Sequence, residues 1–150
     1  MSLSRLIEEA YETFSSFHRP EHFTNRGCCP ECEELSKKIE PCPLRNLETE
    51  HVGHPLYGSR CLLTTEALSY LFPRLLEITL TGSLDKNGDP ILEQYLGVLC
   101  INTELKSNFQ DPQRGIVIKS LDYISKNMSS VVEAWCYERD LEEACAIWNT

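Results

Sequence analysis

The chain has 150 residues, of which 41% are hydrophobic and 25% charged, and its formal net charge is -9. This length and composition fit one globular domain over residues 1–150 and are unlike those of a disordered chain. The negative charge excludes a nucleic-acid backbone as the expected partner and suits a basic protein. No apolar run approaches the roughly 20 residues that a membrane span requires. The N-terminus is amphipathic and acidic rather than a signal peptide, so we expect a cytoplasmic protein with reduced thiols.

Two helices are expected in the first 40 residues. Apolar residues recur at helical spacing over 2–17, and Pro20 follows the end of that helix. Pro30 suits the first position of a second, short helix over about 30–39. The inner face of this second helix would carry Cys32, Leu35 and Ile39.

The strongest candidate for a core helix covers residues 65–80, which are apolar around most of the helix circumference. Thr64 or Thr65 supplies a cap. Pro73 lies in its interior, so we expect a kink there or two abutting helices. The preceding residues 40–63 are rich in proline and glycine and predict a connector, with one helical turn near residues 44–50.

The second half of the chain predicts further helices after a polar turn at 82–90. Residues 91–104 fit helix or strand, and their spacing favours helix. Asp111 is expected to cap a helix over 112–127, and a last helical stretch follows over 129–147. The residues expected to pack this last stretch onto the body are Val132, Ala134, Trp135, Leu141, Ala144, Cys145 and Trp148. We therefore expect an all-α domain of five or six helices with an irregular Cys/His-rich segment at about 18–61.

That segment holds nine of the twelve Cys and His residues of the chain. Irregular, proline-rich chain buries little apolar surface, and a bound metal is one common way to hold such a chain in place. Zinc takes four tetrahedral thiolate or imidazole ligands, and two Cys separated by two residues present both sulfurs to one point. The expected zinc ligands are Cys29, Cys32, His51 and His54, with Cys28, Cys42 and Cys61 as substitutes.

Three other interpretations of the cysteines stay open. Reduced thiols are often simply buried, and packing explains Cys100, Cys136 and Cys145. The cluster at 28–32 also fits buried thiols, a permanent disulfide or redox chemistry. Redox chemistry has a physical basis, because the pKa of Cys29 would be lowered near a helix N-terminus. Three nearby glutamates oppose a thiolate there.

Four motifs resemble those of a bacterial family known only as a domain of unknown function, over roughly residues 5–125. These motifs are RPEHF at 19–23, CCPEC at 28–32, LTTEALSYLFPRLL at 63–76 and DPQR at 111–114. Members look helical and carry an N-terminal cysteine pair, an S-x-E-A-x-x-Y-x-L-P helix and a P-x-Q-R helix start. Thr64 and Phe72 replace the serine and the leucine of that pattern, the later helix start is one residue shorter, and no histidine follows Cys32 at once. The resemblance makes Pro73 part of a pattern and implies no activity.

No phosphate-binding loop, G-x-S-x-G or H-E-x-x-H motif is present in the sequence. We therefore expect a non-catalytic interaction module with a structural zinc or thiol cluster. One alternative is a thiol- or metal-dependent enzyme that uses the Cys28–Cys32 cluster. Another is an immunity- or antitoxin-like inhibitor of a basic partner.

Overall fold

The computed structural model describes residues 2–25, 29–52 and 63–150. These residues form nine α-helices and two short 3-10 helices, with no strand beyond one isolated bridge between Leu84 and Pro90. The expectation of an all-α protein is therefore confirmed. The described helices are α1 (Leu3–Thr13), α2 (Pro30–Ile39), α3 (Thr49–Val52), α4 (Thr65–Leu80), α5 (Leu92–Ile101), α6 (Thr103–Asn108), α7 (Asp111–Asn127), α8 (Ser129–Ala134) and α9 (Glu138–Trp148), with η1 (Phe14–Ser16) and η2 (Leu44–Asn46).

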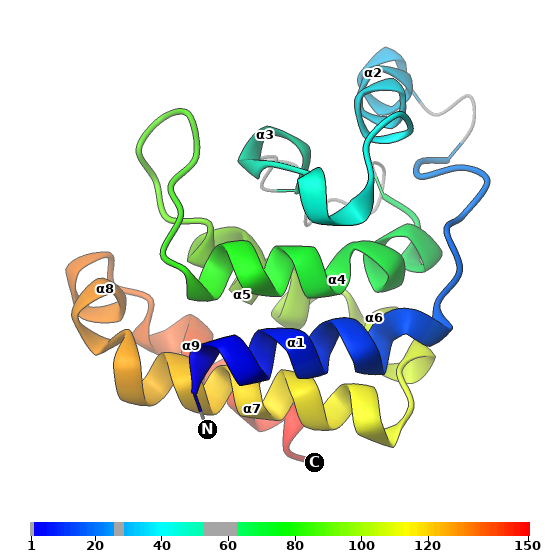
Figure 1. Cartoon of the computed structure of the whole chain (residues 1–150). Coiled ribbons are helices and arrows are strands. Elements are labelled where there is room, and N and C mark those ends of the chain that lie inside the picture. Colours follow the sequence, from blue (N-terminus) through cyan, green and yellow to red (C-terminus); the bar gives the residue numbers. More distant parts are fainter. Residues whose placement is uncertain (1, 26–28, 53–62) are drawn as a thin grey trace.

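Helix α4 is central to the fold, with α1, α5, α6 and α7 packed around it (Figure 1). Eleven of its 16 residues are buried, and Thr64 caps its first turn by accepting a hydrogen bond from the backbone N–H of Ala67. The helix continues through the buried Pro73, so the expectation of two abutting helices is wrong. Packing on several sides holds the helix together where proline removes one backbone hydrogen bond.

An aromatic cluster joins the helices of this body. The ring of Phe72 on α4 stacks on Phe14 at 5.1 Å and meets the edge of Phe109 at 5.3 Å. Trp148 of α9 lies 5.7 Å from Phe109, and its indole N–H donates to the carbonyl of Leu99. Residues far apart in sequence therefore share one apolar core.

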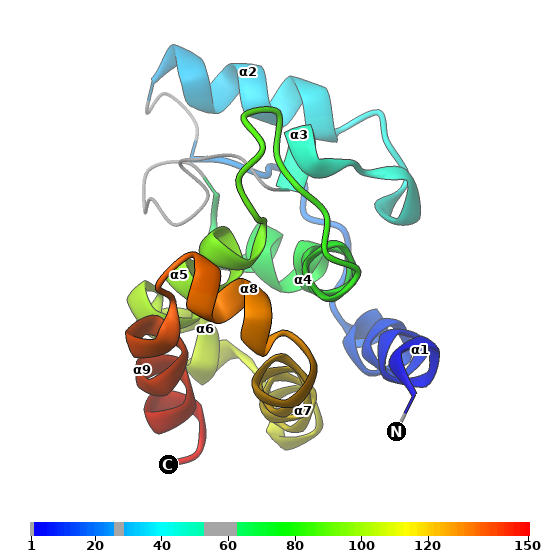
Figure 2. The same cartoon turned by 90° about the vertical axis from the view of Figure 1, so that its left-hand side faces the viewer.

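A smaller part of the chain lies on the other side of α4. We call the described residues 18–25 and 29–52 the arm, and α1 with α4–α9 the body. The arm carries α2, η2 and α3, and both views show α2 as its outermost element (Figure 2). The expectation of an irregular segment over 18–61 is not confirmed, because helices occupy much of its described part. The expected inner face of α2 is confirmed, since Cys32, Leu35 and Ile39 are at most 3% exposed.

The expected number of five or six helices is wrong, for two reasons. The short helices α3 and α6 follow no long apolar pattern, and the expected helix over 129–147 is divided into α8 and α9. The division falls at Trp135–Tyr137, where the backbone of Cys136 adopts φ +58°. As a consequence Ala134 and Trp135 are exposed, which corrects the expectation that they pack. Helix α7 also begins one residue early, with Gln110 rather than Asp111 as its cap.

No helix in the described part of the chain combines the length and the apolar character needed to cross a membrane.

Candidate functional site

The candidate site begins with the Cys-Pro-Glu-Cys stretch at the start of α2. Pro30 is the first residue of the helix, a position where no backbone N–H is required. Cys29 is therefore the cap, in an extended conformation, and its sulfur accepts a hydrogen bond from the backbone N–H of Cys32 at 3.4 Å. The same geometry brings the Cys29 and Cys32 Sγ atoms to 3.1 Å from each other.

The pair lies at the edge of the core. Cys32 is fully buried and belongs to the same apolar cluster as the body, whereas Cys29 is partly exposed. Thr24, only 5% exposed, donates its hydroxyl hydrogen bond to the carbonyl of Cys32 at 3.0 Å. The first turn of α2 is thus fixed from the inside, while Cys29 is partly exposed.

The sulfur separation indicates which chemistry is close. A disulfide bond is about 2.05 Å long, so the two sulfurs would have to approach by about 1 Å to form one. Two thiolates on a tetrahedral zinc, with Zn–S near 2.3 Å, lie about 3.8 Å apart, which requires an opening of about 0.7 Å. Small side-chain rotations reach either arrangement, so the pair fits a metal or a thiol couple.

The other expected ligands lie as follows. His51 on α3 accepts a hydrogen bond at Nδ1 from the backbone N–H of Glu48 at 2.9 Å, and its Nε2 lies 3.8 Å from a carboxylate oxygen of Glu50. The thiol of Cys42 points to the carbonyl of Lys38 at 3.7 Å. His54, Cys28 and Cys61 fall outside the described residues.

Within the described ranges, no three His, Cys, Asp or Glu side chains gather as a metal-binding group. The predicted zinc ligands therefore stay a prediction.

The remaining described thiols lie in the body, around α9. Burial raises the pKa of Cys100 to about 11, with a smaller contribution from Glu143, and burial also raises the pKa of Cys145. Both are partly buried, in line with the expected packing role. Cys136 is exposed instead, so the expectation that it packs is wrong.

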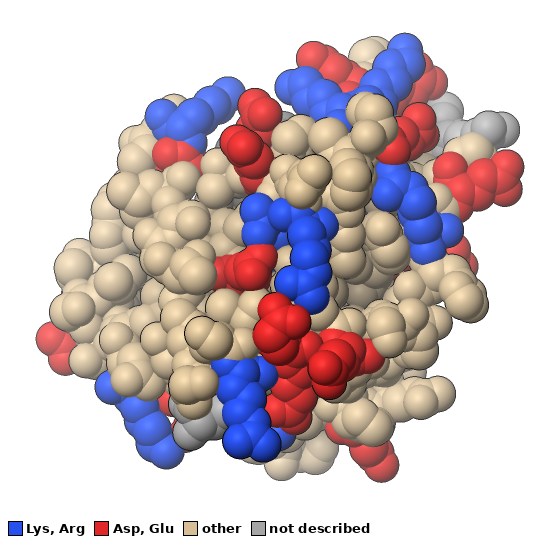
Figure 3. All heavy atoms as spheres, in the orientation of Figure 1, with Lys and Arg blue, Asp and Glu red and all other residues tan. Residues whose placement is uncertain are grey.

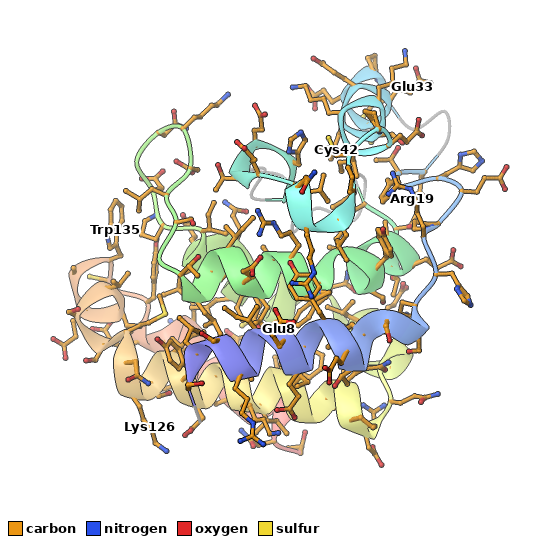
Figure 4. The ribbon with its side chains drawn as sticks, in the orientation of Figure 1. Glu8, Arg19, Glu33, Cys42, Lys126 and Trp135 are labelled. Atoms are coloured by element: carbon orange, nitrogen blue, oxygen red, sulfur yellow. The ribbon has the colours of Figure 1, made fainter. Side chains whose placement is uncertain are left out.

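Arg19 holds the far end of α2, a role that sequence analysis missed. Its guanidinium donates to the carbonyls of Ile39, Glu40 and Cys42, which include those of the last residue of α2 and of its C-cap. The same group lies 5.1 Å from the ring centroid of Phe23 and 5.8 Å from that of Tyr70 on α4 (Figure 4). One cation therefore caps α2 and joins the arm to the body.

Arg45 makes a second connection, from η2 to α1. Two of its nitrogens donate to the two carboxylate oxygens of Glu8 at 3.1 and 3.2 Å. Its guanidinium also lies 3.8 Å from the ring centroid of Tyr11. The hydrogen bond and charge of Arg45 lower the pKa of Glu8, as expected of a carboxylate with a bidentate partner.

A third connection runs from α4. Arg74 donates from Nε to the carbonyl of Leu47 in the arm at 2.6 Å and from Nη1 to Glu77. Glu77 in turn accepts from the Tyr11 hydroxyl at 3.0 Å, and burial with the Glu77 charge raises the pKa of Tyr11. Three arginines therefore hold the arm that presents the cysteine pair.

Comparison of the chain with family models, with curated proteins and with solved structures finds no match. The resemblance to the bacterial family of unknown function accordingly stays a prediction, based on the motifs alone.

Proposed function

We propose that this chain is a non-catalytic, protein-binding module of the bacterial cytoplasm in which Cys29 and Cys32 supply half of a structural zinc site. The observation that carries the proposal is the contact of the two sulfurs at the start of α2, 3.1 Å apart and facing one another. His51 and His54, with Cys28, Cys42 and Cys61 as substitutes, remain the proposed sources of the other ligands. Of these, His54, Cys28 and Cys61 lie outside the described residues.

The position of the pair supports a structural role for the metal. Zinc bound to four protein ligands has no open position for a substrate, and its binding energy adds to the stability of the fold. The buried side chains of the arm belong to the shared core, and three arginines make polar connections between the arm and the body. Two of them, Arg19 and Arg45, are exposed. A metal at the start of α2 would stabilise the end of the helix opposite to Arg19.

The acidic composition supports protein binding. A net charge of -9 repels phosphate backbones and attracts basic surfaces. The two thiols of the body with raised pKa values hold their protons at neutral pH, so they are poor nucleophiles. An immunity- or antitoxin-like inhibitor is one specific form of such a module.

Metal analysis tests the structural site. The chain is purified without a histidine tag or added metal, and zinc is measured by plasma mass spectrometry. We expect about one zinc per chain in the wild type and none in the Cys29→Ser/Cys32→Ser variant. Cys136→Ser, which changes an exposed thiol distant in sequence from the arm, is the matched control and should keep its zinc. A metal-free wild type would contradict the zinc site.

One observation favours a second function, thiol chemistry at Cys29. The Cys29 sulfur accepts a backbone N–H at a helix N-terminus, an arrangement that stabilises a thiolate. In a thiol oxidoreductase, Cys29 of the metal-free wild type would react with iodoacetamide near neutral pH in the native state. A thiol that reacts only after denaturation excludes this function and leaves the structural one.

A further inference from the structure

Helices α8 and α9 are joined by a tight turn at residues 135–137. The backbone N–H of Tyr137 donates to the carbonyl of Val132 at 2.9 Å, and that of Cys136 donates to the carbonyl of Glu133 at 3.3 Å. This pair of hydrogen bonds is the Schellman motif, in which the residue in the left-handed conformation is usually glycine. Here Cys136 occupies that position with φ +58°.

The turn leaves one of two neighbouring aromatic residues buried and the other exposed. Tyr137 is 6% exposed, whereas Trp135 is 44% exposed and stacks on the Tyr137 ring with centroids 6.4 Å apart. If α8 continued as a helix through residue 137, the side chains of residues 135 and 137 would point in other directions than they do in the turn. The conformation of Cys136 therefore holds a large apolar side chain at the surface.

Hollows lie on both sides of α8. On one side, a pocket of about 100 Å³ lies between Trp135, Met128 and the 82–90 loop, whose Leu84 is 54% exposed. On the other side, a groove of about 250 Å³ runs between α7, α8 and α9. Its apolar lining comes from Ile124, Val132 and Leu141. The side of the molecule that carries Trp135 is largely uncharged where α8 meets the loop (Figures 3 and 4).

Acidic side chains line the groove. Glu133, Glu138 and Glu142 all line it and are all exposed. None of them takes part in an ion pair within the described part of the chain. Residues 82–93 and 129–143 together hold eight acidic residues and only two basic ones, Lys86 and Arg139.

Carboxylates also act on Tyr137, on the aromatic side of the turn. Burial raises the pKa of Tyr137 to about 12, and the carboxylates of Glu93, Asp89, Asp140 and Asp85 add to the shift. These carboxylates come from the loop, from α5 and from α9. Carboxylates therefore lie near Tyr137, although no charged side chain lines the pocket itself.

We propose that this surface, called the α8 surface and made of the pocket and the groove on either side of α8, binds a basic amphipathic segment of a partner protein. An apolar side chain of that segment packs on Trp135, and its Lys or Arg side chains pair with Glu133, Glu138 and Glu142. This inference rests on the proposed function as a protein-binding module and names its surface and the chemistry of its partner.

Charge and shape together select this partner. A cluster of unpaired carboxylates repels nucleic acids and anionic lipid surfaces and attracts Lys and Arg. Exposed aromatic residues beside an apolar groove are typical of sites that take an amphipathic helix. Pairing with a basic segment would relieve the repulsion between the carboxylates of the groove.

The test uses a defined probe, a synthetic amphipathic peptide of about 12 Leu and Lys residues. Binding to the full chain is followed by NMR through the two indole N–H signals. The Trp135 signal should shift on titration. The Trp148 signal should stay in place, because its N–H is buried and bonded to the Leu99 carbonyl. A peptide with Glu in place of Lys should leave both signals unchanged.

Two variants locate the site. Because Trp135→Ala removes the reporting signal, the affinities of the variants are measured by isothermal titration calorimetry. Trp135→Ala, and the triple variant Glu133→Gln/Glu138→Gln/Glu142→Gln, should each weaken binding about tenfold. Glu12→Gln/Glu34→Gln/Glu66→Gln is the matched control, because it changes three exposed acids elsewhere and alters the net charge by the same amount. The control should bind within about twofold of the wild type, the small change expected from screened long-range charge.

The outcomes separate this inference from the function it rests on. Equal weakening by the two triple variants would mean non-specific charge attraction, and no shift of Trp135 would mean no docking, so either result overturns the α8 surface. A natural basic partner that co-purifies with the wild type in fixed stoichiometry, and equally with Trp135→Ala, would keep the binding module and remove only the α8 surface. A chain that co-purifies with no partner and does not bind the probe would contradict both.

Discussion

The arm and the body of this molecule share one apolar core but differ in how far they depend on polar contacts. In the body, Phe14, Phe72, Phe109 and Trp148 meet in one aromatic cluster, and α4 is buried along most of its length. In the arm, α2 places a short apolar face inward, but its two ends depend on polar contacts. Its start is capped by Cys29 and its end by the Arg19 guanidinium.

The difference matters because the two kinds of contact fail in different ways. Apolar burial is non-directional and shared by many residues, so the body tolerates small shifts of any one side chain. Polar contacts require a defined geometry, and each contributes about 1 kcal/mol. A metal at the cysteine pair would add to the stability of the arm.

The largest expected effect is in the body. Phe72→Ala removes a fully buried ring at the centre of the aromatic cluster and should lower the free energy of unfolding by about 3–5 kcal/mol. Guanidinium denaturation followed by circular dichroism measures the loss. Trp135→Ala, at an exposed position, is the control and should cost less than about 1 kcal/mol. Equal losses in both variants would show that the body does not depend on this cluster.

A smaller and more local effect is expected in the arm. Arg19→Ala removes the cap of α2 and the contact with Phe23 and Tyr70, and should destabilise the arm by about 1–2 kcal/mol. Amide hydrogen exchange should accelerate in α2 and stay unchanged in α7. Arg19→Lys keeps the charge but not the planar group, so it should restore only part of the protection. Full restoration by lysine would show that charge alone holds the arm.

The body also carries side chains whose ionisation should lower its stability at alkaline pH. The folded-state pKa values of Cys100 and Tyr137, about 11 and about 12, lie above the ordinary values of these side chains. The unfolded chain therefore loses these protons first, and the stability that they contribute is complete below about pH 9 and lost as pH rises to about 12. These two groups should account for about 1–2 kcal/mol of the loss after allowance for solvent screening.

Urea midpoints between pH 8 and 11.5 measure this loss. Tyr137→Phe should lessen the fall above about pH 10, because phenylalanine has no proton to lose. Tyr11 and Tyr95, whose pKa values are also raised by burial, keep part of that fall. An unchanged profile in that variant would mean that Tyr137 does not titrate as the structure indicates.

The smallest expected effect concerns two helix ends with the same geometry. Helices α4 and α8 both end in a Schellman motif, with Gly82 at φ +77° in the first and Cys136 at φ +58° in the second. Cys136→Gly should therefore raise the free energy of unfolding by about 0.5–1 kcal/mol, and Gly82→Ala should lower it by a similar amount. Thermal unfolding checks both. A destabilised Cys136→Gly would show that the cysteine side chain makes a needed contact.

These two helix ends also show how far the sequence predicts the fold. The end of the helix over 65–80 was predicted correctly, because Gly82 and the polar residues after it are typical of a turn. The end of α8 was missed, because cysteine in a left-handed conformation leaves no signal in the sequence. One expected helix over 129–147 therefore proved to be two. Local composition predicts a helix end only where the residue at the turn is the one that the turn prefers.

The candidate site was predicted in the same partial way. Proline at the first helical position and the two-residue spacing predicted that Cys29 and Cys32 share the start of a helix, and the structure places them there. The role of Arg19 was not predicted, because its partners are backbone carbonyls that every residue carries. The α8 surface was also missed, because it depends on the division of one expected helix.

The most direct test of the arm as a metal-stabilised element is amide hydrogen exchange with and without zinc. The purified chain is compared before and after treatment with a chelator, and exchange is followed in α2, α4 and α7. Loss of zinc should accelerate exchange in α2 by at least about tenfold and leave α4 and α7 unchanged, because the body has its own apolar core. Equal protection of α2 in both samples would contradict a structural zinc at Cys29 and Cys32.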